Sequence, residues 1–126
     1  MAIFKTVALA FALALFGAGS SAYADQAPSP QPEGATVYII SPVDGATVTS
    51  PLTVVFGLKG MGVAPAGVEK ANTGHHHLLI DTDLPTGDEL NDPILADAHH
   101  IHFGGGQTQA TIKLAPGKHR LQLLMG

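Results

Sequence analysis

The sequence predicts an all-β protein, and two observations carry that prediction. Short runs of β-branched, aliphatic and aromatic residues alternate with turn signals rich in Gly, Pro and Asp, and no segment after residue 34 repeats its apolar residues with the period of a helix. The chain also contains no cysteine. Its fold must therefore rest on an apolar core, since disulfides and thiolate metal sites are both excluded.

Residues 1–24 have the pattern of a secretory signal peptide. Lys5 is followed by an apolar run over residues 7–16, and small residues then lead to Ala22-Tyr23-Ala24. The run is shorter than the roughly 20 apolar residues that a membrane-spanning helix needs, so we expect no membrane anchor. Cleavage between Ala24 and Asp25 would deliver a periplasmic or secreted protein.

The remaining chain divides into a tether and one domain. Residues 25–34 are polar and contain three prolines, a composition typical of an extended linker. The folded domain is expected over residues 35–126, a length that suits one domain with an apolar core of its own.

Six strands are expected in this domain, with two long loops between them. The strands are predicted at residues 36–40, 52–58, 76–81, 100–103, 109–114 and 119–125. Residues 60–73 and 82–98 form the loops, and the part from 93 to 98 could make one helical turn. Short strands separated by turns indicate an immunoglobulin-like antiparallel β-sandwich. In that layout one more strand would close the sheet, so we expect this chain to lack its last strand.

The charge balance narrows the classes of partner. The formal net charge is −4 at pH 7 with histidine neutral. Nucleic-acid binding calls for a basic surface, so no nucleic-acid partner is expected. Metal cations remain compatible with an acidic domain.

Histidine is the strongest chemical signal. Six of the seven histidines lie in two clusters, at residues 75–77 and 99–102, and each cluster contains an H-x-H pattern. Alternate residues of a strand share a face, so His75 and His77 would point one way, as would His100 and His102. Paired strands place opposite Cβ atoms about 4.5–5.5 Å apart. Four imidazoles could then converge on one metal ion, while Leu78 and Ile101 face the core.

Two other interpretations of these histidines stay open. Histidine is often half-buried and bonded to backbone or carboxylate groups, and Asp81, Asp83 and Asp97 are close enough in sequence to accept such bonds. The clusters could therefore form a structural hydrogen-bond network. A catalytic centre is a third reading, but no general base is identifiable.

Imidazole ligands suit copper(II) and zinc. The lack of cysteine excludes a blue-copper site, and Met61 and Met125 are too few to indicate a copper(I) site.

Three segments together resemble one bacterial family, the domain of unknown function DUF4399. They read SPVDGATV, FGLKGMGVAPAGVEKANTGHHHLLID and HIHFGGGQT. The resemblance covers residues 36–126 and implies a small exported β-domain without an established activity. Family members are expected to continue into a further His-containing segment and a last strand, and that segment could supply further ligands.

The sequence therefore favours a non-enzymatic, exported, metal-binding module for copper or zinc, with His75, His77, His100 and His102 as ligands. The alternative is a structural or protein-interaction domain whose histidines form a hydrogen-bonded network. A metal-dependent hydrolase ranks third.

Overall fold

The computed structural model describes residues 30–126. The predicted signal peptide and most of the predicted tether lie outside these residues. Within the described part, no helix is long and apolar enough to cross a membrane.

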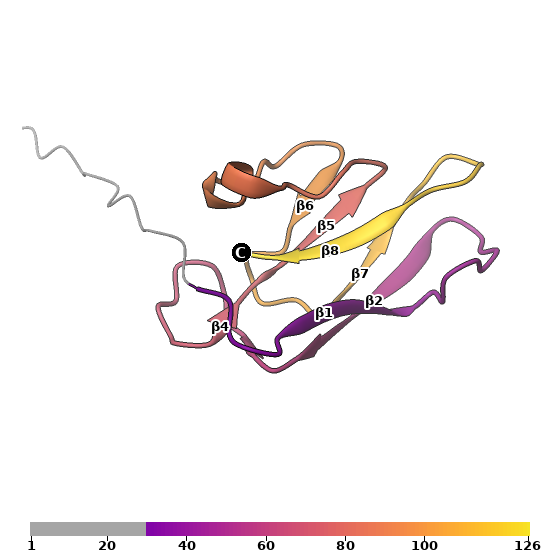
Figure 1. Ribbon diagram of the computed structural model, residues 1–126. Coiled ribbons are helices and arrows are strands. Elements are labelled where there is room, and N and C mark those ends of the chain that lie inside the picture. Colours follow the sequence, from indigo (N-terminus) through magenta and orange to yellow (C-terminus); the bar gives the residue numbers. More distant parts are fainter. Residues whose placement is uncertain (1–29) are drawn as a thin grey trace, which may run out of the picture.

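Antiparallel strands dominate the structure and form two three-stranded sheets (Figure 1). One sheet has the order β1 (Thr36–Ser41), β2 (Leu52–Lys59), β7 (Gln109–Ile112), and the other has the order β6 (His100–His102), β5 (His76–Ile80), β8 (Leu121–Met125). The expected all-β, antiparallel architecture is confirmed, and each of the six strands lies within about two residues of its expected position. The immunoglobulin-like arrangement stays a prediction.

The two sheets share one apolar core. Along β2, Leu52, Val54 and Phe56 are buried, whereas Thr53 is exposed and its hydroxyl lies 2.9 Å from that of Thr111 on β7. This alternation turns one face of the strand to the core. From the other sheet, β5 and β8 contribute Leu78, Ile80 and Leu123 to this core. Figure 1 shows β8 running alongside β1, so the sheets close on each other at this side.

The central strand β5 is buried on both faces, since all five of its residues are buried. Leu78 and Ile80 point to the core, and His77 and Leu79 lie on the opposite face. The register with β6 pairs His77 with His102, Leu78 with Ile101, and Leu79 with His100. The strands that carry the two H-x-H patterns therefore pair, as the sequence suggested, but His75 lies outside this register and only His77 and His102 are opposite each other. Ile101 packs against the core cluster.

The loops differ from expectation in two places. Within residues 60–73 the chain forms a short parallel pair, β3 (Gly62–Val63) with β4 (Thr73–Gly74). The only helical segment among the described residues is the 3-10 helix η1 (Gly87–Asn91), so the expected turn at 93–98 was wrong. The helix begins after Thr86, whose N–H donates to the Glu89 carboxylate at 3.2 Å.

Residues 93–98 do not form a helical turn. The backbone of Asp97 pairs with that of His100 instead. The N–H of each residue donates to the carbonyl of the other, at 3.1 and 3.3 Å. This bridge turns the chain into β6 and so positions the second histidine cluster.

Candidate metal centre

Three imidazoles converge on the outer face of the second sheet, away from the core. His77 lies on β5, His102 lies opposite it on β6, and His75 immediately precedes β5. Each offers a ring nitrogen, and these three nitrogens all lie within 4.8 Å of one another. The Nε2 atoms of His75 and His77 are 2.9 Å apart. The rings of His77 and His102 are stacked, with centroids 4.8 Å apart and an interplanar angle of 7°.

His75 is held in place by the end of β8. Its N–H donates to the carbonyl of Gly126 at 3.0 Å, and the Gly126 N–H donates back to the His75 carbonyl at 2.9 Å. These two hydrogen bonds extend the β5–β8 ladder by one residue beyond Met125. They bring His75 next to His77 even though His75 is outside the strand.

Glycine at position 126 keeps space at the ring nitrogens. A Cβ atom there would lie 2.6 Å from the His77 Nε2 and 3.2 Å from the His75 Nε2. Real Cβ atoms are essentially never found closer than 3.0 Å to such an atom. A side chain at this position would therefore fill the space in which an ion bound by these two nitrogens would lie.

The cluster disfavours protonated imidazole. Burial first, and then charge repulsion from the neighbouring His75 and His102, lower the pKa of His77 to about 4. The pKa of His75 is also lowered, first by burial and then by His102. Neutral imidazole is the form that binds metals, so at neutral pH these rings are in the ligand state without first having to release a proton.

The donor set fits copper(II) or zinc. Both ions accept imidazole nitrogen, and Zn–N bonds are about 2.0–2.1 Å long. Nitrogens within 4.8 Å of one another can all reach such an ion after small side-chain rotations. No carboxylate joins the group among residues 30–126.

His100, the fourth expected ligand, is not part of this group. It lies opposite Leu79 in the register, and its Nδ1 is 2.8 Å from the carboxylate of Asp97. The hydrogen bond from His100 is the main cause of the lowered pKa of Asp97. The structure thus brings together three of the four expected ligands and gives the fourth a carboxylate partner.

Two further histidines make hydrogen bonds typical of structural residues. The Nδ1 of His99 lies 2.8 Å from the carbonyl of Ile80. His119 has an acceptor at both ring nitrogens, with Nδ1 2.7 Å from the Asp81 carboxylate and Nε2 2.6 Å from the Ala115 carbonyl.

His76 is a residue whose position the histidine pattern alone did not reveal. Its side chain is on the core face of β5, is only 1% exposed, and packs against Phe56 with ring centroids 5.0 Å apart. Neither of its ring nitrogens has a hydrogen-bond partner within residues 30–126. The signal that could have found it is the alternation with Leu78 and Ile80, which places residue 76 on their face.

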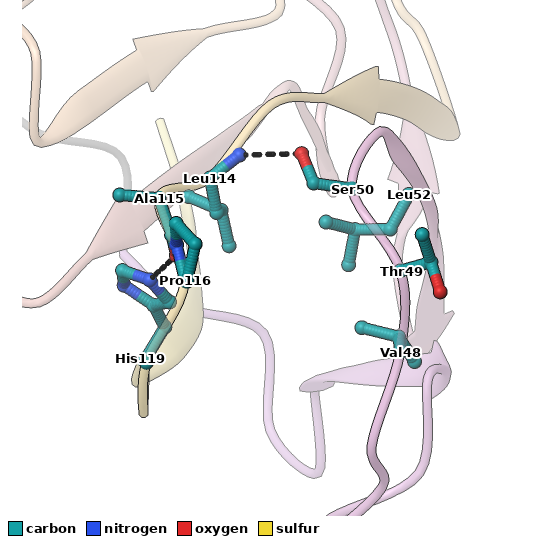
Figure 2. Close-up of a pocket in the computed structure, with 9 residues that line it drawn as sticks. Val48, Thr49, Ser50, Leu52, Leu114, Ala115, Pro116 and His119 are labelled. Carbon is teal, nitrogen blue, oxygen red and sulfur yellow. Dashed lines mark hydrogen bonds between the residues drawn. The ribbon is translucent and has the colours of Figure 1, made fainter.

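The surface hollows lie elsewhere. One, of about 280 Å³, separates residues 48–52 from residues 114–119, and Figure 2 shows Val48 and Leu52 on one side with Pro116 and His119 on the other. A more open one of about 430 Å³ is lined by Asp81 and residues 118–120. Neither hollow is lined by a member of the histidine group, whose three residues range from buried His77 to exposed His102.

Comparison with known proteins places the chain in a family. No curated protein and no solved structure matches it. The sequence model of a family described as a domain of unknown function (DUF4399) matches residues 54–126, a stretch that contains both histidine clusters and every strand except β1 and the first residues of β2. Because this match covers more than half of the chain, the protein belongs to the DUF4399 family.

Proposed function

We propose that this domain is a non-enzymatic metal-binding module that holds copper(II) or zinc through His75, His77 and His102. The observation that carries the proposal is the convergence of three ring nitrogens within 4.8 Å. Within residues 30–126, the hydrogen-bond contact of these rings is the one between His75 and His77, and it lies inside the group.

The contrast with the other histidines supports a ligand role for this group. In a structural network the ring nitrogens have hydrogen-bond partners in the protein, as those of His99, His100 and His119 do. The Nδ1 of His77, by contrast, is buried and has no partner among the described residues. Repulsion between neighbouring imidazoles also destabilises the protonated form of the cluster. The neutral form, which is favoured instead, is the one that can bind a metal cation.

Metal titration of untagged protein tests the proposal. We expect copper(II) or zinc to bind one to one and to raise the melting temperature as its concentration increases, because an ion that binds only the folded state stabilises it. The His75→Ala/His102→Ala double variant should lose both effects while leaving the buried His77 in place. His99→Ala, which changes an exposed histidine outside the group, should keep them.

Equal metal binding by the double variant and the unchanged protein would contradict this assignment. No binding by either protein, together with a lower melting temperature of the metal-free double variant, would favour the structural network instead.

We also propose that the module acts in the periplasm or outside the cell. Three features of residues 1–24 support this proposal: the positive charge of Lys5, the apolar run that follows it, and the Ala-x-Ala end. Intact-mass measurement of the protein expressed with its full sequence should give a chain that begins at Asp25. A product that retains residues 1–24 would contradict export by cleavage.

A further inference from the structure

We propose that the ion held by His75, His77 and His102 keeps one open coordination position that takes a small exogenous anion, and that Gly104 keeps this position free. This inference rests on the proposed metal site and deepens it. It assigns a ligand class to the ion and a specificity-determining role to a residue outside the histidine group.

The three histidines leave one coordination position of the ion open and do not neutralise its charge. Zinc sites with three protein ligands, known from catalytic sites, hold water or another small ligand in the fourth position, whereas structural sites are closed by four protein ligands. Neutral imidazoles contribute no charge, and among residues 30–126 no carboxylate joins the group. A divalent ion there would keep its full double charge in a partly buried place, where the attraction for an anion is stronger than in bulk water.

The exposure of the three ligands shows on which side the open position lies. His77 is buried, His75 is half-buried and His102 is exposed, so the cluster opens to solvent at His102. Gly104 follows two residues after His102. A Cβ atom on it would lie 2.9 Å from the His102 Nε2 and 3.2 Å from its Cε1.

Small groups line this opening. The same Cβ position at Gly104 is 3.3 Å from the methyl group of Ala66, and the Ala66 N–H donates to the Gly104 carbonyl at 2.8 Å. The hydrogen bond fixes the backbone of both segments beside His102. The Cβ position of Gly104 therefore lies between the His102 ring and the methyl group of Ala66, so the methyl group of an alanine there would crowd the ring nitrogen that glycine leaves uncovered.

The backbone does not require glycine at position 104. Gly106 has a φ of +80°, a conformation that disfavours other residues, whereas Gly104 has no such positive φ. Alanine is therefore compatible with the backbone at 104, and its methyl group would collide only with neighbouring side chains. Gly105 supplies a matched control, because a Cβ atom there would meet only the flexible side chain of Gln107, at 3.1–3.3 Å.

Azide titration of the copper(II)-loaded protein tests the inference, with copper affinity measured first and separately. Azide is a small anionic probe whose binding to copper(II) gives a new charge-transfer absorption band and a changed EPR spectrum. We expect the unchanged protein and Gly105→Ala to bind copper and azide alike. Gly104→Ala should bind copper and have at least tenfold lower azide affinity.

The outcomes separate the inference from the proposed function. Failure of copper and zinc to bind at all would remove the proposed function. Copper binding without any azide response would leave the metal site standing and overturn the open position. Equal azide affinity in Gly104→Ala and Gly105→Ala, or loss of copper itself in Gly104→Ala alone, would overturn the role given to Gly104.

Discussion

The Nε2 atoms of His75 and His77 lie 2.9 Å apart, a distance at which one nitrogen must donate and the other accept if only a proton lies between them. Two imidazolium ions could not share this contact, since both nitrogens would then be donors. Burial of His77 also disfavours its protonated form. The pair therefore links the protonation of the cluster to the stability of the fold.

The metal-free protein should lose stability as the pH falls from about 6.5 to about 4. An unfolded histidine has a pKa of about 6.5, whereas His77 in the fold has a pKa of about 4. Between these values the unfolded state binds more protons, so the free energy of unfolding decreases with decreasing pH, by up to about 3 kcal/mol for this residue at 1.36 kcal/mol per pKa unit. Urea unfolding in the presence of a chelator measures the slope.

His77→Gln should make this slope shallower without abolishing it, because the pKa values of His75 and His76 are also lowered. The lowered pKa values of Asp81 and Asp97 add to the loss of stability at the acid end of this range, and they do so equally in the variant and the unchanged protein. An identical slope in the variant and the unchanged protein would contradict the prediction.

His119 should give a pH dependence of the opposite sign. Both of its ring nitrogens face acceptors, and only the imidazolium form can donate to both Asp81 and Ala115. The hydrogen bond to Asp81 is the main cause of its raised pKa. The stabilisation should be fully present below about pH 6.5, the pKa in the unfolded chain, and should be lost as the pH rises through the higher pKa of the folded state.

Urea midpoints between pH 6 and pH 9 measure this effect, and His119→Gln should flatten the profile there. Asp81→Asn is the matched control, because it keeps an oxygen acceptor but removes the charge, and it should also flatten the profile. A decline of equal size in all three proteins would assign it to other groups.

Metal affinity should distinguish His102 from His100, although both lie on β6 and share its outer face. His102→Ala removes a ligand and should weaken zinc or copper(II) binding by more than about 100-fold, the upper end of the effect of losing an outer-shell partner. His100→Ala should weaken it by less than about tenfold, since His100 contacts Asp97 and lies outside the group. Similar losses in the two variants would make His100 a fourth ligand.

The sequence was sufficient to predict the strands and the face on which the histidines lie. The period of two separates His77 from Leu78 and His102 from Ile101, and the core confirms that separation. Histidines on the same face of a sheet, however, do not all lie close enough together to bind one ion. Which histidines meet depends on the register between β5 and β6, and the long connection between those strands does not fix it locally.

One local and one long-range contact then determine the membership of the group. Asp97 bonds to His100 through a turn that the sequence did not predict, and Gly126 draws His75 into the group through the ladder with β8. The role proposed for Gly104 depends on its closeness to His102, which the spacing of the two residues in the sequence does not reveal. Local pattern therefore predicted candidate ligands, and tertiary pairing selected among them.

We expect the buried imidazole of His76 to lower the free energy of unfolding of the metal-free protein, compared with an apolar side chain at this position. Its imidazole is buried against Phe56, and neither of its nitrogens has a partner among the described residues. A buried polar group without a partner destabilises a protein by about 1–3 kcal/mol. His76→Leu places an apolar side chain next to Leu78 and should raise the urea midpoint by the equivalent of about 1 kcal/mol or more, with an unchanged m-value.

The gain from His76→Leu should be larger at pH 5 than at pH 8. Burial is the first cause of the lowered pKa of His76, so near pH 5 the unfolded state of the unchanged protein gains a proton that the folded state binds less readily. Leucine has no such difference between the two states. His76→Gln, which keeps a polar group at the site, is the control and should give no gain at pH 8. A lower midpoint for His76→Leu than for His76→Gln at both pH values would show that the imidazole has a stabilising partner in the folded protein.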